Sequence, residues 1–343
     1  AAIEAIKAGK TKYTAVDGTP GLKQAIIHKF KKENQLDYQA NQILVSCGAK
    51  HSFSNLFQAL LNPGDEVIIP APYWVSYPDM VKLADATPII IQADINQHFK
   101  ITPQQLEKHI NTKTKLFILN SPSNPTGVAY SQQELAALGE ILLQHPNVII
   151  ATDDIYEHIL WSQDKFCNIV NACPKLYDRT VVINGVSKVY AMTGWRIGYA
   201  AGPAELIGAM KKHQSQNTSG PNSIAQAAAE AALIGDQHCV GEMVKVFQQR
   251  HDYLYQELKQ LNGIECIPAQ GTFYLFPNIT QAMRNLNLES DIAFASQLIE
   301  KQGVAIVPGT AFGAPGHLRF SYATSLDVLR EAVKRLRIFL EPT

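Results

Sequence analysis

The chain has 343 residues, of which 46% are hydrophobic and 17% charged, so it can bury a large core and does not have the composition of a disordered protein. Lys+Arg and Asp+Glu both number 30, and this zero net charge argues against nucleic acid or an anionic membrane surface as a partner. The length suits one large domain with a smaller one.

Cysteine usage and hydropathy add to these limits. The five cysteines are odd in number, form no C-x-x-C motif and lack histidines at zinc spacing, so we expect reduced thiols and a cytoplasmic location; they are Cys47, Cys167, Cys173, Cys239 and Cys266. The longest apolar runs have the length of strands, and no signal peptide opens the chain. The first residues, AAIEAIKAGK, read like the end of a helix, so we expect a further segment before them.

Short apolar runs alternate with helical patterns over the first two thirds of the chain. Strands are predicted at residues 43–46, 66–70, 88–92, 115–120, 148–152, 180–184 and 196–200. Helices are predicted around Phe53–Leu61 and over 132–143 and 220–234, between these strands. This alternation predicts an α/β domain over residues 14–236 with a mostly parallel, seven-stranded sheet.

The last hundred residues have a different pattern. A long helix is predicted over 244–261, followed by strands at 271–276, 303–307 and 317–322. The final helix carries Leu329, Val333, Leu336 and Leu340 on one face, with Ser325 as its N-cap. We therefore expect a smaller α+β domain formed by residues 237–343 together with residues 1–13.

One motif carries more chemical information than the others. A predicted strand runs into Gly-Val-Ser-Lys188, and a lysine attacks an aldehyde only when its site keeps the amine neutral. Arg196 follows eight residues later, beside a predicted strand, and an arginine there can bind a phosphate through two hydrogen bonds. A single lysine is by default a surface residue, but the combined pattern S-K-x-x-x-M-T-G-W-R-I-G-Y is too specific for chance.

This stretch resembles the cofactor-lysine signature of class I, fold type I aminotransferases, and the similarity extends from Tyr13 to the final helix. Within that family the chain is similar to the bacterial aspartate and prephenate aminotransferase branch. The resemblance implies pyridoxal 5'-phosphate (PLP) as the cofactor, held by Lys188 as a Schiff base. It also implies a homodimer with shared active sites.

The phosphate end of the expected cofactor site follows strand 43–46. A helix N-terminus there offers free N–H groups and a positive dipole end, although a plain strand–helix turn explains the motif equally well when taken alone. The resemblance implies that the phosphate is bound by Gly48, Ala49, Lys50, Ser187 and Arg196, with Tyr13 reaching in from the partner subunit. Gly185 stands where relatives often carry a serine, so one hydroxyl expected at the phosphate is absent.

An acid is expected beside the cofactor's ring nitrogen, because a carboxylate favours the protonated ring that serves as an electron sink. Two neighbouring aspartates follow the apolar run 148–152. The family pattern D-x-x-Y selects Asp153 for this role and Tyr156 as a donor to the phenolic oxygen of the cofactor. Asp154 is interpreted as an N-cap of the following turn.

Two further residues are assigned to the cofactor by the resemblance. Asn124 lies in a loop with two prolines and a glycine, which fix its backbone, and it matches the family's amide donor to the phenolic oxygen. Trp74 matches the aromatic that stacks on the ring, whereas a tryptophan taken alone is more often a core residue. Both also border the substrate.

Substrate recognition is expected from charged side chains. Arg319 matches the arginine that binds the α-carboxylate; a surface salt bridge is its structural alternative. Lys50 matches a lysine that recognises a distal carboxylate, which favours aspartate, glutamate and their 2-oxo acids. Thr218 or Ser219 is expected to contribute across the dimer interface.

The resemblance therefore implies an aminotransferase that moves an amino group between aspartate and 2-oxoglutarate in a ping-pong mechanism, with Lys188 as the proton carrier. A prephenate or aromatic amino acid aminotransferase is the nearest alternative. A PLP-dependent C–S lyase and a PLP-sensing transcription regulator are more distant ones, and the latter needs a DNA-binding domain that the balanced charge does not suggest.

Overall fold

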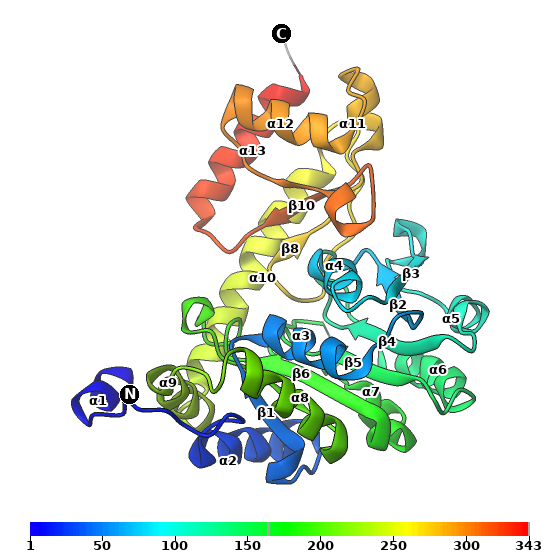
Figure 1. Cartoon of the computed structure of the whole chain (residues 1–343). Coiled ribbons are helices and arrows are strands. Elements are labelled where there is room, and N and C mark those ends of the chain that lie inside the picture. The colour runs from blue at the N-terminus through cyan, green and yellow to red at the C-terminus, as the bar shows by residue number, and fades with distance from the viewer. Residues whose placement is uncertain (163–164, 342–343) are drawn as a thin grey trace.

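The computed structural model describes residues 1–162 and 165–341. Its larger part contains a seven-stranded sheet in the order β1-β7-β6-β5-β4-β2-β3 (Figure 1). The strands are β1 (Ile43–Ser46), β2 (Glu66–Ala71), β3 (Thr87–Gln92), β4 (Thr114–Asn120), β5 (Ile149–Asp153), β6 (Thr180–Gly185) and β7 (Gly198–Ala201). Only β7 pairs antiparallel with its neighbours, β1 and β6, so the predicted, mostly parallel α/β sheet is confirmed.

Helices cover both faces of this sheet, which explains why its central strands are apolar throughout. One face packs against α3 (Ala49–Leu60), α4 (Ser76–Lys82) and α8 (Ala204–Asn217). The other packs against α2 (Pro20–Lys29), α5 (Pro103–His109), α6 (Gln132–Leu143), α7 (Ile169–Ala172) and α9 (Ser223–Ile234). Every residue of β1, β6 and β7 is buried.

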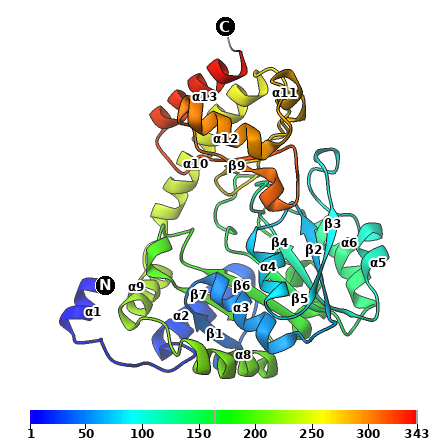
Figure 2. The ribbon, with the colours of Figure 1, turned by 45° about the horizontal axis from the view of Figure 1, so that its top comes forward.

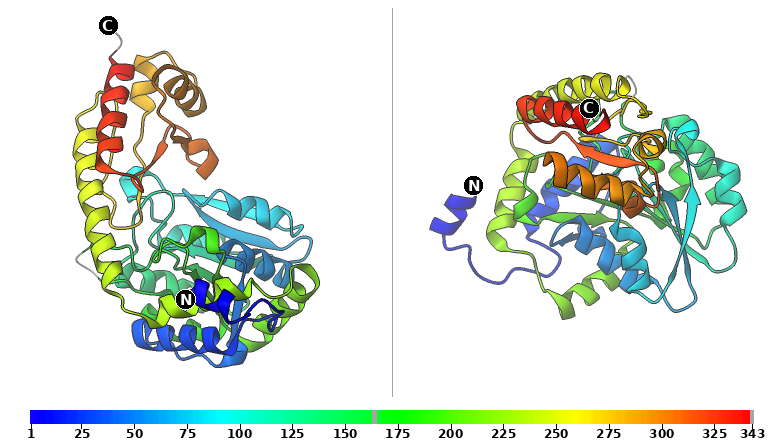
Figure 3. Two further views of the ribbon diagram at one scale, coloured as in Figure 1. Left: turned by 90° about the vertical axis from the view of Figure 1, so that its left-hand side faces the viewer. Right: turned by 90° about the horizontal axis from the view of Figure 1, so that it is seen from above.

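The smaller part is built around α10 (His238–Lys259), which runs from the large sheet up to the top of the molecule (Figure 3). A three-stranded sheet follows in the order β8-β10-β9. Its strands are β8 (Tyr274–Leu275), β9 (Val307–Pro308) and β10 (Leu318–Ser321), and its helices are α11 (Thr280–Asn285), α12 (Asp291–Gln302) and α13 (Leu326–Leu340). Leu329, Val333 and Leu336 of α13 are buried in the core of this part, and Ser325 caps the helix as predicted.

Several predicted boundaries differ from the structure for local reasons. The strand predicted at 196–200 begins only at Gly198, because Arg196 has a left-handed backbone with φ +56°. The strand predicted at 303–307 is shorter, because Gly303, with φ +65°, caps the end of α12. The helix predicted from residue 220 begins at Ser223, where Asn222 accepts a hydrogen bond from the N–H of Ala225.

The N-terminal helix α1 (Ala2–Lys7) packs beside α9 at the end of an extended arm (Figure 2). The predicted division at residue 236, with residues 1–13 joined to the smaller part, stays a prediction.

None of the helices in the described part combines the length and the apolar character needed to cross a membrane. The remaining short helical turns are η1 (Phe30–Asn34), η2 (Ala40–Gln42), η3 (Ile95–Gln97), η4 (Pro174–Arg179), η5 (Thr193–Trp195) and η6 (Gly309–Phe312).

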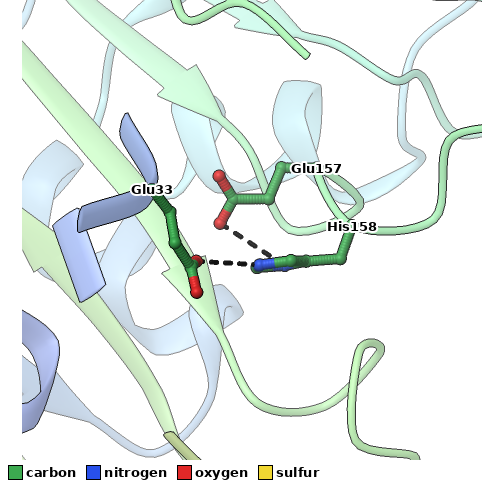
Figure 4. Close-up of side chains that lie close together, drawn as sticks. All are labelled: Glu33, Glu157 and His158. Carbon is green, nitrogen blue, oxygen red and sulfur yellow. Dashed lines mark hydrogen bonds and ion pairs between the residues drawn. The ribbon is translucent and has the colours of Figure 1, made fainter. Parts of the chain in front are cut away.

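A buried ion-pair network ties the turn after β5 to α2 and η1. Lys29 binds Glu157, whose two carboxylate oxygens also accept hydrogen bonds from Asn184 at 2.6 Å and Asn34 at 2.7 Å. Glu33 and His158 close the cluster, with 2.9 Å between Oε2 and Nε2 (Figure 4). Burial raises the pKa of the Glu157 carboxyl, but Lys29, His158 and Asn34 together outweigh that effect and bring the pKa below its ordinary value. The network therefore fixes the turn immediately after Tyr156.

Glu33, Glu157 and His158 have the spacing of metal ligands in the described part of the chain. The Lys29 ammonium nevertheless occupies one face of the Glu157 carboxylate, and both carboxylate oxygens already accept hydrogen bonds. A divalent cation here would be repelled by that ammonium. We therefore interpret the cluster as a structural ion-pair network.

This network generates a stability prediction. Replacing Lys29 with methionine leaves Glu157 charged, buried and without its cation, so the free energy of unfolding should fall by about 3–5 kcal/mol. The matched control is Lys7→Met, which removes an exposed lysine–glutamate pair and should cost less than about 1 kcal/mol. Urea unfolding measures both; equal losses would contradict the assignment.

Candidate active site

A cavity of about 250 Å³ opens at the carboxyl ends of the central strands, as expected for ligand sites in open α/β sheets. It brings together residues that lie far apart in the sequence. The predicted residues among its lining are Ala49, Lys50, Trp74, Asn124, Asp153, Tyr156, Ser187, Lys188, Arg196 and Arg319. Asn120, Ile155, Thr193 and Tyr274 also line it and were not predicted. Tyr13 does not reach this cavity, since its side chain is 99% exposed.

Lys188 lies on the loop after β6 and is partly buried. Within residues 1–162 and 165–341 its amine has no hydrogen-bond or ion-pair partner, and its Nζ lies 5.5 Å from the centroid of the Phe273 ring. Burial lowers the pKa of the Lys188 ammonium, and the charge of Asp153 opposes that shift. Arg319 and Arg196 add to the lowering. The site thus increases the fraction of neutral amine, the form that attacks a carbonyl group, relative to a lysine in water.

Asp153, the last residue of β5, is the acid of the cavity and is 5% exposed. Its Oδ2 accepts a hydrogen bond from the Tyr77 hydroxyl at 2.5 Å, and its Oδ1 accepts one from the N–H of Ile155 at 3.4 Å. Burial has the largest effect on the pKa of Asp153, and the Tyr77 hydrogen bond and the charge of Lys188 oppose it. The net result is that the pKa of Asp153 is raised to about 6. The carboxyl is therefore mostly ionised at neutral pH.

The interpretation of Asp154 as an N-cap is wrong. Its carboxylate accepts hydrogen bonds from the Thr152 hydroxyl at 2.6 Å and from the Asn168 side chain, which caps α7. Burial, followed by the neighbouring charge of Glu157, raises the pKa of Asp154 to about 7. Asp154 joins β5 to α7 and faces away from the cavity lining.

The loop after β4 is held by Asn120, which the sequence analysis missed. Its side chain donates to the backbone oxygen of Asp153 at 2.9 Å and accepts from the N–H of Asn124 at 2.8 Å. Asn124 in turn accepts a hydrogen bond from Arg319 Nη1 at 2.9 Å. Asn120 is the last residue of β4 and pairs with Asp153, the last residue of β5, in the parallel register. A polar residue at the end of a predicted strand was therefore the sequence pattern that could have indicated Asn120.

Arg319 enters the cavity from β10 between two aromatic rings. Its guanidinium carbon lies 4.5 Å from the Tyr274 ring centroid and 4.8 Å from that of Phe312. In the described part of the chain it forms no ion pair, and its buried Nε has no hydrogen-bond partner. The structural alternative, in which Arg319 forms a surface salt bridge, is therefore excluded. The edge of the guanidinium that carries the unpaired Nε has the geometry to bind a carboxylate. Tyr274 also joins Tyr156, with 3.1 Å between the two hydroxyls.

The end of the cavity near α3 is positively charged. Gly48 precedes the helix with φ +85°, and a Cβ there would come within 2.2 Å of Arg196 Nη2. Arg196 donates to the backbone oxygen of Thr193 at 2.9 Å and contacts no carboxylate among the described residues. Together with the free N–H groups of the helix start, this arrangement suits a phosphate.

Gly185 is confined by its neighbours. A Cβ at this position would lie 2.9 Å from the backbone oxygen of Ile197 and 3.0 Å from the Cα of Gly198. A serine at this position would therefore require the chain at Ile197 and Gly198 to shift.

Lys50 and Trp74 border the open side of the cavity. The Lys50 ammonium is exposed and lies 5.1 Å from the centroid of the Trp74 ring. Trp74 packs edge-on against Tyr77, with 5.3 Å between ring centroids. Lys50 and Arg319 thus bring two cations to the lining of one cavity.

The contact between Gly48 and Arg196 yields a prediction. Gly48→Ala should displace the guanidinium and weaken the binding of inorganic phosphate about tenfold or more. Gly64→Ala is the matched control, because Gly64 has a similar φ of +94° and nothing within 4 Å of an added Cβ. Both substitutions should lower stability by about 1 kcal/mol. Titration calorimetry measures the affinity; an unchanged value for Gly48→Ala would contradict the assignment.

Comparison with known proteins places the chain among enzymes. The family model for class I and II aminotransferases matches residues 1–336. The aspartate/prephenate aminotransferase of Nitrosomonas europaea is 57% identical over 99% of this chain and 87% of its own length. The aspartate aminotransferase of Geobacillus stearothermophilus is 50% identical over 99% of this chain and 86% of its own.

Solved structures agree with this relationship. The aspartate aminotransferase of Rhizobium meliloti superposes with a TM-score of 0.94 at 45% identity, covering 99% of this chain and 86% of its own. The Thermus thermophilus aspartate aminotransferase with maleate has a TM-score of 0.91 at 38% identity, covering 98% and 86%. The chain belongs to the class I and II aminotransferase family and is an aminotransferase of fold type I.

Proposed function

We propose that the cavity binds pyridoxal 5'-phosphate and that the enzyme moves the amino group of aspartate to 2-oxoglutarate. The observation that carries this proposal is the Lys188 amine, which lacks a partner among the described residues and shares a buried cavity with Asp153. The donor set fits this cofactor, with cations and a helix start at one end and a buried acid at the other. When bound, PLP supplies an electron sink for the negative charge that develops on the substrate's α-carbon.

Each group of residues has a distinct task in this proposal. Asp153, held ionised, favours a protonated ring nitrogen. Asn124 and Tyr156 would donate hydrogen bonds to the phenolic oxygen of the cofactor, and Trp74 would lie against its ring. Gly48, Ala49, Lys50, Ser187 and Arg196 would hold its phosphate. Lys188 would hold the cofactor's aldehyde carbon and, once released by the substrate amine, its Nζ would take the proton from the substrate's α-carbon.

The substrate is proposed to bind between two cations. Arg319, with its free guanidinium edge beside Asn124, binds the α-carboxylate. Lys50 binds the distal carboxylate of aspartate or glutamate from the open side of the cavity. The solved Thermus relative with maleate, a dicarboxylate, supports this choice of substrate class.

We also propose a cytoplasmic homodimer. Tyr13 belongs to the N-terminal arm that also carries α1, is 99% exposed and does not line the cavity of its own chain, in keeping with a contact to the phosphate in the partner's site. Ile3 and Ile6 of the same arm are 67% and 55% exposed, and a partner subunit would cover them. Thr218 and Ser219 directly follow α8, and we propose that they contribute across the interface.

Prephenate is a second candidate substrate. Two relatives, 57% and 52% identical, carry the name aspartate/prephenate aminotransferase. Prephenate also has two carboxylates, so Arg319 and Lys50 could serve both compounds. Initial rates with aspartate as donor and either 2-oxoglutarate or prephenate as acceptor separate the two; phenylalanine as donor tests the aromatic alternative.

Two substitutions test the proposed division of labour. Lys50→Gln should lower kcat/KM for aspartate about 10- to 100-fold and leave phenylalanine turnover nearly unchanged, because only aspartate offers a distal carboxylate and the substitution keeps the backbone N–H that position 50 offers to the phosphate. Arg319→Gln should lower kcat/KM for both by a similar factor. Steady-state kinetics with aspartate and phenylalanine measures both effects. Equal losses of kcat/KM for the two donors in Lys50→Gln would refute the role of Lys50 in binding the distal carboxylate. A wild-type enzyme that is inactive with aspartate would refute the proposed function.

A further inference from the structure

The buried tyrosine behind the acid of the cavity has no role in the function proposed above. Tyr77 lies in the first turn of α4, is 1% exposed, and donates its hydroxyl to Asp153 Oδ2 at 2.5 Å. In residues 1–162 and 165–341 no other side chain hydrogen-bonds to the Asp153 carboxylate, whose second oxygen is reached only by the backbone N–H of Ile155.

We propose that Tyr77 is a positioning residue that keeps the Asp153 carboxylate ionised and aimed at the ring nitrogen of the bound cofactor. The inference rests on the proposed PLP site. Tyr77 does not line the cavity, so it acts through Asp153 and not by touching substrate.

Packing fixes the direction of the Tyr77 hydroxyl. The ring lies edge-on to Phe53, with 5.1 Å between centroids, and to Trp74, with 5.3 Å and an interplanar angle of 88°. The N–H of Tyr77 also donates to the backbone oxygen of Trp74 at 3.0 Å. One turn of chain therefore places both the aromatic proposed to lie on the cofactor and the group that orients its acid. A shift of this turn would move both together.

The hydrogen bond also favours the charged form of the acid. Burial alone raises the pKa of Asp153, and a donor to the carboxylate is the physical means of lowering it again. Burial, followed by the charge of Asp153, raises the pKa of the Tyr77 phenol well above its ordinary value, so the phenol remains a donor at neutral pH. The other titratable groups around this carboxylate are Lys188, on the loop after β6, and Asp154 and Tyr156 on its own segment.

Tyr77→Phe removes only the hydroxyl. The affinity of the apoenzyme for PLP should fall about tenfold or more at neutral pH, since a hydrogen bond to a charged group is lost. Protonation of Asp153 weakens binding as the pH falls, and without its donor Asp153 protonates at a higher pH. The decline in affinity should therefore begin at a higher pH in the variant. Tyr73→Phe is the matched control, because Tyr73 lies in the same segment, makes no hydrogen bond to Asp153 and should show no change.

A double-mutant cycle separates positioning from packing. In an Asp153→Asn background, Tyr77→Phe should cause less than about a twofold further loss of PLP affinity, because the acid through which it acts is gone. A loss as large as in the wild type would overturn the proposal. If Tyr77→Phe fails to fold, 3-fluorotyrosine at position 77 is the second variant, because it keeps the packing and its more acidic hydroxyl is a stronger hydrogen-bond donor. The decline of PLP affinity with falling pH should then begin at a lower pH than in the wild type. An unchanged pH dependence of the affinity would overturn the proposal. A wild-type protein that does not bind PLP would instead refute the proposed function.

Discussion

The active site depends on the cost of burying an amine and a carboxylate in one cavity. Water does not fully solvate Lys188 or Asp153, so burial lowers the pKa of the amine and raises that of the acid. Their mutual attraction works against both shifts. Burial therefore shifts the amine toward its neutral, nucleophilic form beside an acid that is ionised at neutral pH, and no other pair in the cavity lining combines these properties.

The surrounding structure holds these two groups in place through separate supports. Tyr77 and the N–H of Ile155 hold the carboxylate of Asp153, and Asn120 holds its backbone. The ion pair between Lys29 of α2 and Glu157 anchors the turn that follows Asp153. These supports come from α2, α4, β4 and the turn after β5, so several elements of the large part together position the acid. Arg319, from β10, closes the set by contacting Asn124.

The sequence predicted the parts of this arrangement that depend on local pattern or on a long motif. The parallel sheet followed from apolar runs that alternate with helical spacing, and Lys188, Arg196 and Asp153 followed from motifs that resemble a known family. Contacts between distant segments could not be predicted, because no local pattern marks them. Tyr77, for example, has the pattern of a core aromatic in the sequence, and only the fold brings its hydroxyl to Asp153 at the end of β5. The misinterpretation of Asp154 had the same origin, since its partner Asn168 lies fourteen residues away in a different element.

The central claim is that one amine, on the loop after β6, carries the cofactor. Reducing the PLP-loaded protein with borohydride and mapping the modified peptides by mass spectrometry tests this most directly, because reduction fixes the cofactor to the nitrogen that holds it. We expect a phosphopyridoxyl group on Lys188 and on no other lysine. Modification of another lysine with Lys188 left free, or no modification of a protein that binds PLP, would contradict it.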